Sequence, residues 1–170
     1  MAAMVLVTFN VIFWTLFEQA GSSLTLFADR NTNLSVFGLF SLSAPQTQNF
    51  NSIAIMLLAP VMSVLWGALA KRNLEPSIPI KFAIALMGVG AGFLFLVLGT
   101  RFVGPDFKVG LWWLAGLYVI HSLAELCISP VGLSMITKLS IARVVGLMMG
   151  VWFLSISVAQ YFAGMIAQVA

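Results

Sequence analysis

This 170-residue chain contains a series of apolar stretches, each long enough to cross a lipid bilayer. A transmembrane helix needs about 20 consecutive, mostly apolar residues. Such stretches fold as helices because the bilayer interior offers the backbone no water to bond with. Stretches of this kind lie at roughly 4–27, 50–70, 80–99, 111–137 and 144–168. The sequence therefore predicts an all-α fold, a polytopic transmembrane bundle of about five spanning helices.

The composition also indicates a lipid bilayer as the surrounding medium. Hydrophobic residues make up 61% of the chain and charged residues 8%, whereas average soluble domains are about 45–50% apolar and about 25% charged. A chain of this size cannot bury so much apolar surface in a soluble core, so lipid must cover part of it. The net charge of +3 is spread over loops. This argues against nucleic-acid binding, which requires a basic patch.

The polar connections between the stretches predict the orientation of the chain. Cytoplasmic loops of membrane proteins carry an excess of Lys and Arg. The first and third connections carry Arg30, Arg101 and Lys108, whereas the second and fourth carry Lys71, Arg72, Lys81, Lys138 and Arg143. We therefore expect the amino terminus to be cytoplasmic, in a multi-pass protein of the cell membrane (plasma or inner). Lys81 is counted here with the second connection. On this count, no Lys or Arg lies inside a span.

Two carboxylates, Glu18 and Glu125, fall inside the apolar stretches. An ionisable residue at this depth costs at least about 2.5–3.5 kcal/mol on insertion, so it usually faces an interior cavity and has a function there. A carboxylate that is partly desolvated but close to a cation can take up and release a proton near neutral pH. The alternative is a protonated acid that simply hydrogen-bonds a neighbouring helix.

Each carboxylate belongs to a row of polar and aromatic residues at helical spacing. Residues three or four positions apart share one face of a helix. The rows are Asn10, Trp14, Glu18 and Ser22 in the first stretch, and Tyr118, His121, Glu125 and Ser129 in the fourth. His121 lies one turn before Glu125 and can share its proton. The alternative is that His121 hydrogen-bonds a backbone carbonyl.

Other stretches add polar groups of their own. Asn51 lies with Gln48 and Ser52 at the entry to the second stretch, and Trp152 shares a face with Ser155 in the last one. Spacing alone leaves open whether Trp152 packs in the core or contacts a ligand. Several helices with polar rows can enclose a substrate cavity, which favours transport. The sequence contains neither a nucleophile–base pair nor a phosphate-binding loop, so we expect no enzyme.

Single residues exclude or suggest further features. One cysteine and one histidine do not provide a Cys-based metal site or a pair of histidine ligands, so we expect no metal and no bound cofactor. Pro60 and Pro130 lie inside spans, where each removes a backbone donor and favours a kink. Such a kink is either structural or part of a gate. Pro130 comes five residues after Glu125 and would bend the helix beside that carboxylate.

Four segments carry a family resemblance. "FWTLFEQAGSSLTLFADRNT" (13–32) resembles the seventh helix of the proton-dependent oligopeptide transporter family, a branch of the major facilitator superfamily. "QNFNSIAIMLLAP" (48–60) is similar to the eighth helix, "ELCISPVGLSMITKLS" (125–140) to the tenth, and "GLMMGVWFLSISVA" (146–159) to the start of the eleventh. The resemblance covers nearly the whole chain, and it implies a partial major-facilitator fold, namely helices seven to eleven of the carboxy-terminal half.

The resemblance implies roles for individual residues. Glu18 matches an acid associated with proton coupling, with protons as the coupling ion. Glu125 matches the acid that receives the amino terminus of a small peptide, and Asn51 matches an asparagine that contacts the bound peptide. Trp152 matches a tryptophan that lines a side-chain pocket, and Ser155 falls beside serine positions near it. His121 matches no family motif.

These roles predict a fragment of a secondary active transporter that takes up di- and tripeptides with protons by alternating access. The cation for the peptide carboxylate would come from the amino-terminal half, which we expect as a missing partner. One alternative is a family member that moves another small solute such as nitrate, although Glu125 favours a substrate with an amine. Another is a truncated membrane fragment that does not transport.

Overall fold

The computed structural model describes residues 2–36, 38–104, 106–139 and 142–169. Its α-helices are α1 Ala2–Phe17, α2 Ser23–Asn31, α3 Asn49–Lys71, α4 Ile78–Gly99, α5 Leu111–Leu139 and α6 Val145–Ala167. Short 3₁₀ helices extend or join them: η1 Glu18–Gly21, η2 Ala44–Gln48, η3 Thr100–Phe102 and η4 Ala142–Val144. Two-residue strands pair in the connections, β1 Thr32–Asn33 parallel to β4 Val109–Gly110, and β2 Ser35–Val36 antiparallel to β3 Phe40–Ser41. The expected all-α bundle is confirmed.

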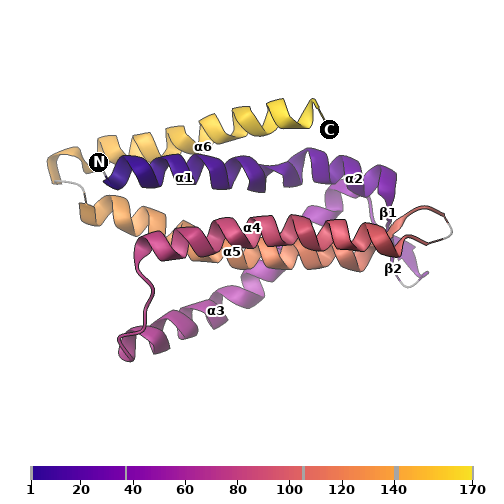
Figure 1. Ribbon diagram of the computed structural model, residues 1–170, viewed down its shortest axis with the longest axis horizontal. Coiled ribbons are helices and arrows are strands. Elements are labelled where there is room, and N and C mark those ends of the chain that lie inside the picture. The colour runs from indigo at the N-terminus through magenta and orange to yellow at the C-terminus, as the bar shows by residue number, and fades with distance from the viewer. Residues whose placement is uncertain (1, 37, 105, 140–141, 170) are drawn as a thin grey trace.

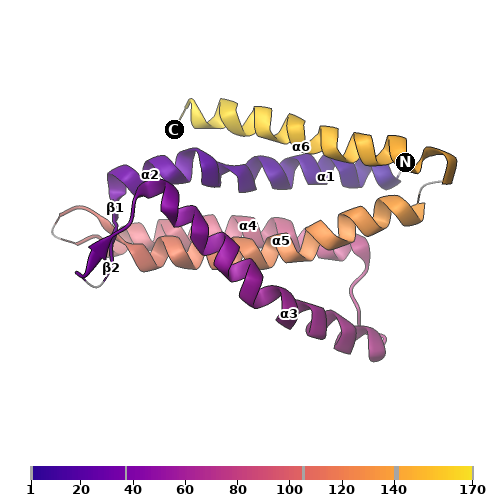
Figure 2. The same cartoon turned by 180° about the vertical axis from the view of Figure 1, so that it is seen from behind.

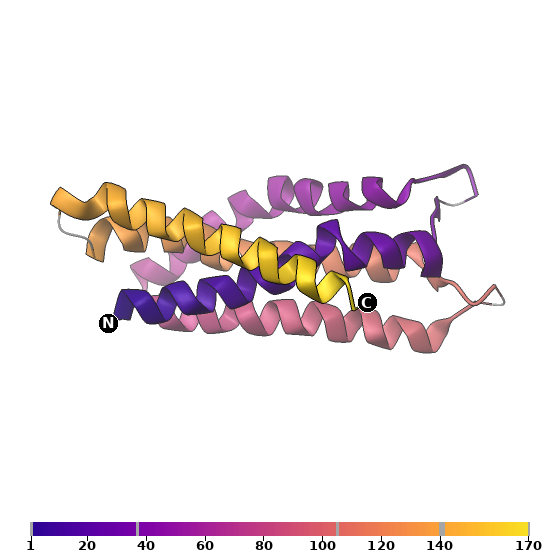
Figure 3. The same cartoon turned by 90° about the horizontal axis from the view of Figure 1, so that it is seen from above.

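The helices form two layers with a crossing helix behind them. α1 and α6 lie side by side and run in the same direction, while α4 and α5 form the second layer (Figure 1). α3 crosses α5 obliquely, and its carboxy-terminal end diverges from the bundle (Figure 2). The view from above shows the elongated shape that the bundle has along its helices (Figure 3).

Length and composition make four of the described segments capable of crossing a membrane: Ala44–Lys71, Ile78–Phe102, Leu111–Gly132 and Val145–Ala167. The first apolar stretch, 4–27, is instead divided between α1, η1 and α2. The division begins at Glu18, where the helix tightens into a 3₁₀ turn. Ser22 follows with φ −128° and ψ −93°, outside the helical region, so α2 starts as a separate helix.

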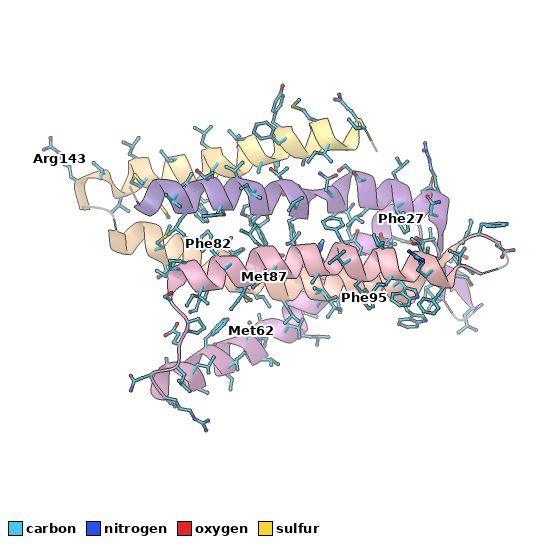
Figure 4. The ribbon with its side chains drawn as sticks, in the orientation of Figure 1. Phe27, Met62, Phe82, Met87, Phe95 and Arg143 are labelled. Atoms are coloured by element: carbon cyan, nitrogen blue, oxygen red, sulfur yellow. The ribbon has the colours of Figure 1, made fainter. Side chains whose placement is uncertain are left out.

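Small residues bring α4 and α5 into close contact. A Cβ added at Gly92 would overlap the ring of His121, and one added at Gly88 would come within 2.9 Å of Ala124 Cβ. Transmembrane helices associate largely through such close packing, because lipid tails are as apolar as the side chains. The side chains of Figure 4 add to this core: Phe82 of α4 is directed towards α1 and is buried, whereas Met87 lies on the outer face of α4.

One expectation about charged residues is wrong. Lys81 does not lie in a connection but in the first turns of α4, where it is 5% exposed. Its Nζ lies 2.5 Å from Glu75 Oε1 and 4.6 Å from the centre of the Trp66 ring. The predicted stretch 80–99 already contains this position, but the sequence-based count assigned Lys81 to the preceding connection because it is charged and lies at the start of the stretch. Burial of Lys81 is possible because an acid and an aromatic face surround its charge.

Candidate functional site

Polar side chains gather at a hollow between η1, the start of α3 and α5. The hollow has a volume of about 300 Å³ and is lined by Phe17, Glu18, Ala20, Gly21, Gln48, Asn49, Asn51, Ser52 and Tyr118. Two apolar grooves on the outside of α1 contain few polar atoms by comparison. This hollow contains a carboxylate together with amide and hydroxyl groups, which can bind a polar solute.

Glu125 reaches this hollow through Asn51. Asn51 Nδ2 donates to Glu125 Oε2 over 3.4 Å. The hydroxyl of Ser122 lies in close contact with Asn51 Oδ1 and 2.8 Å from the carbonyl oxygen of Tyr118. Because the Asn51 oxygen faces Ser122, its amide hydrogens face the carboxylate. Ser122 thereby orients the amide that links α3 to Glu125.

Glu18 lines the hollow from η1, whereas Asn51 and Glu125 belong to α3 and α5. It is the first residue of η1 and is half-buried. Gln160 Nε2 of α6 donates to Glu18 Oε1 over 3.5 Å, at the long end of hydrogen-bond distances. A second, shallower hollow on this side is lined by Glu18, Gly21, Ser22, Gln160, Ala163 and Gly164. Glu18 therefore lies between the two hollows, with one side towards Asn51 and the other towards α6.

The structure separates His121 from the other members of its row. An α-helix turns by about 100° per residue, so Tyr118 and Glu125 differ by only about 20°, whereas His121 lies about 40–60° away from them. His121 is 1% exposed, and its Nε2 lies 3.1 Å from the carbonyl oxygen of Val89 in α4. Its ring also packs against Phe93 and Gly92. This geometry is the carbonyl-bonded alternative left open by the sequence.

Trp152 and Ser155 are buried at contacts between helices. The Trp152 ring, 4% exposed, lies so close over Gly132 of α5 that an added Cβ there would overlap it. Ser155 accepts a hydrogen bond of 2.9 Å from Asn10 Nδ2 and donates to the carbonyl oxygen of Trp152. Both residues therefore have packing partners within the chain, which is the alternative that spacing left open for Trp152.

The two prolines lie inside helices as expected. Pro60 falls within α3 and Pro130 within α5. The carboxy-terminal part of α5 turns away from the line of α4 towards the layer of α1 and α6 (Figures 1 and 2). A proline inside a helix is a common cause of such a bend. A gating role for either proline stays a prediction.

Sequence patterns missed some polar residues that the fold brings to the site. Ser122 lies outside both rows, yet it contacts Asn51. Gln160 lies in α6, 142 positions from Glu18, and meets it only through packing of the helices. The signal available in the sequence was the polarity of these residues inside apolar stretches. This polarity does not reveal the hydrogen-bond partners, because the partners depend on the face that each helix turns towards its neighbours.

Comparison with known proteins identifies the family of this chain. The model of the POT family matches residues 1–170. The chain is 37% identical to the peptide transporter YePEPT of Yersinia enterocolitica over 95% of this chain and 32% of that protein. It is 33% identical to dipeptide and tripeptide permease A of Escherichia coli over 97% of this chain and 32% of that protein. The chain thus spans about a third of the length of these relatives.

Solved structures give the same picture of the fold. A crystal structure of a mutant peptide transporter, POT, in complex with alafosfalin superposes with a TM-score of 0.89 and 35% identity, over 99% of this chain and 34% of that one. A POT family transporter in complex with 5-aminolevulinic acid superposes with a TM-score of 0.85 and 29% identity, over 96% of this chain and 34% of that one. The helices described above are therefore arranged as in about a third of such a transporter.

Proposed function

Because the chain belongs to the POT family of membrane transporters, we propose that it is part of a secondary active transporter that takes up di- and tripeptides together with protons. Protons are the coupling ion in this proposal, without another cofactor. The remaining helices of the transporter are the partner that completes the substrate cavity, because alternating access requires two halves that move around a central site. The substrates are small peptides.

The observation that carries the proposal is the pairing of two membrane-embedded acids with one amide at a polar hollow. Asn51 lines this hollow together with Glu18, and its amide hydrogens face Glu125. The amino terminus of a peptide is a cation, and a carboxylate is its natural partner. Glu125 is the proposed receptor for that amine, and Asn51 is the proposed contact for the peptide backbone.

Glu18 is the proposed proton site. It is half-buried and reaches both the hollow and α6, so a change in its charge would alter contacts on both sides. His121 is a weaker candidate for the same task, since its ring nitrogen is already engaged by Val89. Trp152 and Ser155 are also proposed as substrate contacts. Both are buried between helices here, so in this scheme they meet the substrate when the α5–α6 contact opens during transport. Pro60 and Pro130 are the proposed points of bending.

The proposal also includes an orientation. We place the protein in the cell membrane with the amino terminus of the chain cytoplasmic. Lys71, Arg72 and Arg143 then lie on the cytoplasmic side, where basic residues are in excess. In this orientation α1 and α6 run from the cytoplasmic to the external side, since the two helices are parallel (Figure 1).

The test uses the full-length protein that contains this chain, reconstituted in liposomes. Glu125→Gln should weaken binding of a dipeptide about 10- to 150-fold, because a hydrogen bond to a charged group contributes about 1.5–3 kcal/mol. Binding is measured by competition against a labelled dipeptide. Asp106→Asn, which neutralises an exposed acid, is the matched control and should leave the affinity unchanged. Unchanged affinity in Glu125→Gln would remove this residue from the site.

A second candidate substrate is a small amine that is not a peptide. The related transporter whose structure holds 5-aminolevulinic acid supports this possibility. An anion such as nitrate is disfavoured, because Glu18 and Glu125 place two acids at the proposed site. Competition of the labelled dipeptide by 5-aminolevulinic acid and by nitrate, in the same assay, separates the three substrate classes.

A further inference from the structure

The break after α1 interrupts a helix within an apolar stretch, so the backbone groups that lose their helical hydrogen bonds there need other partners. Glu18–Gly21 form a 3₁₀ turn, and Ser22 leaves the helical region before α2 begins at Ser23. Irregular backbone at membrane depth is tolerated only where protein or a water-filled cavity satisfies the freed polar groups. The residues that hydrogen-bond the freed backbone groups therefore determine where the break can lie and how its side chains are directed.

One side chain, Gln19, contacts all three segments that meet at the break. It is 4% exposed. Its Nε2 donates over 3.2 Å to the carbonyl oxygen of Thr15 in α1 and over 3.2 Å to that of Ala163 in α6. Its Oε1 accepts a hydrogen bond from Ser23 Oγ, the first residue of α2, over 2.5 Å. An amide has two N–H donors and a carbonyl acceptor, so Gln19 is satisfied by these three contacts.

Gln19 also belongs to a row of polar contacts that join α1 and η1 to α6. Asn10 Nδ2 donates to Ser155 Oγ, Thr15 Oγ1 donates to the carbonyl oxygen of Ala159, and Gln19 donates to that of Ala163. Ser155, Ala159 and Ala163 are four positions apart, so they share the face of α6 that meets α1. Because these α6 residues are small, the two backbones approach closely enough for the side chains of α1 to reach across.

We infer that Gln19 is a positioning residue that fastens the Glu18–Ser22 turn to α6 and thereby sets the direction of the Glu18 carboxylate. This inference rests on the proposed proton role of Glu18. Glu18 itself meets α6 at Gln160, three residues before Ala163. Gln19 and Glu18 thus contact neighbouring turns of α6. Release of Gln19 would let the turn move relative to α6 and would disturb the 3.5 Å contact between Gln160 and Glu18.

The test is a double-mutant cycle in the full-length protein, reconstituted in liposomes. Gln19→Leu keeps the size of the side chain but removes its hydrogen bonds. It should lower the ratio of proton-driven accumulation to peptide exchange about fivefold, because the Gln160–Glu18 contact that the turn holds in place is one ordinary hydrogen bond. The KM for exchange should stay unchanged. In a Glu18→Gln background the same substitution should have no further effect, because the two residues act through one site. Gln168→Leu, an exposed position at the end of α6, is the matched control.

Two results of this cycle would overturn the inference. One is an equal loss of driven uptake and exchange in Gln19→Leu, which indicates a purely structural role. The other is a full effect of Gln19→Leu in the Glu18→Gln background. A wild-type protein that does not accumulate peptides would instead contradict the proposed function.

Hydrogen exchange tests the fastening without any transport assay. Gln19→Leu should speed amide exchange in residues 18–26 of the full-length protein about fivefold relative to Gln168→Leu, because the turn loses its anchor to α6. Unchanged exchange in that segment would overturn the inference whatever the substrate of the transporter is.

Discussion

Individual residues at the hollow differ in how far their surroundings constrain them. Asn51 is held by Ser122, so the direction in which its amide faces Glu125 is set before any substrate arrives. Within the described part of the chain, the hydrogen bond of Glu18 is the long one from Gln160. The amide beside Glu125 is thus oriented by a further residue, Ser122, which suits recognition of a fixed charge, while Glu18 can change partners with its protonation state. This difference agrees with the proposal of Glu125 as amine receptor and Glu18 as proton site.

Neutralising Glu18 tests its proposed role directly. Glu18→Gln keeps the shape of the side chain but cannot take up or release a proton. In the full-length protein we expect accumulation driven by a proton gradient to fall at least about tenfold, the range of a lost charge-assisted hydrogen bond. Peptide exchange without a gradient should fall much less. Uptake that keeps its normal dependence on the proton gradient would contradict the coupling role.

At the level of helices, close contacts at glycines determine how α5 packs against its neighbours. Gly132 accepts the Trp152 ring from α6, while Gly88 and Gly92 accept Ala124 and His121. By contrast, no described atom of a neighbouring element lies within 4 Å of a Cβ added at Gly146 or Gly150 of α6. The same four-residue spacing therefore marks a tight interface in α4 and an open face in α6.

Filling the contact at Gly132 should destabilise the bundle. In Gly132→Ala the new methyl group overlaps the Trp152 ring, which is buried and cannot move without disturbing α6. We expect a loss of about 1–3 kcal/mol, the usual range for overpacking, measured as a lower Tm in detergent. Gly90→Ala is the matched control, because it lies inside α4 with open space around it. It should be neutral or slightly stabilising, since alanine favours helix. Equal Tm values for both variants would contradict this packing account.

The connection between α3 and α4 depends on Lys81. Its side chain is 7% exposed, while that of Glu75 is 44% exposed. Lys81→Met keeps the aliphatic stem but removes the ion pair with Glu75 and the charge over Trp66. Because water can reach Glu75, we expect a loss of about 1–2 kcal/mol rather than the larger loss typical of fully buried pairs. Thermal unfolding in detergent measures it, with the exposed Lys71→Met as control. A Lys71→Met effect as large as that of Lys81→Met would contradict the prediction.

The α3 side is the most open part of the molecule, because the candidate span that contains α3 is the least buried of the four among the described residues. α3 diverges from α5 (Figure 2). It exposes apolar side chains over much of its length, including Met56 at 70% and Val64 at 74%. The hollow with Glu18 and Asn51 lies beside the same helix. In a bilayer, lipid or further helices cover such surfaces. The described helices therefore provide a part of the proposed substrate site but do not enclose it.

This openness leads to a prediction about the chain alone. Liposomes that contain only residues 1–170 should show no saturable dipeptide uptake, because one group of helices cannot alternate access around a site. Joining the chain to the amino-terminal half of a peptide transporter of the same family should restore uptake above the background of empty liposomes. Saturable uptake by the chain alone would show that it forms a complete cavity, for example by self-association.

Much of this protein follows from its sequence. The long apolar stretches require helices, because only helices satisfy their own backbone groups in lipid, and the depth of Glu18 and Glu125 indicates an interior site. Motifs such as Ser-Pro-x-Gly-Leu-Ser after Glu125 led to the family, which the comparisons confirm. These features are local, because hydrophobicity, length and motif spacing belong to single stretches of chain.

The partners of each polar residue depend on how the helices pack. The contacts Asn51–Ser122, Gln19–Ala163 and Gln160–Glu18 join residues that are 71, 144 and 142 positions apart. The rotation of each helix against its neighbours is set by which small residues allow close approach, and this is a property of the whole packed bundle. For the same reason His121, one turn from Glu125 in sequence, contacts Val89 instead. Likewise, Gln19 lies beside the helix break at Glu18, and only the packing of the helices brings its partner, the carbonyl oxygen of Ala163 in α6, within hydrogen-bond distance.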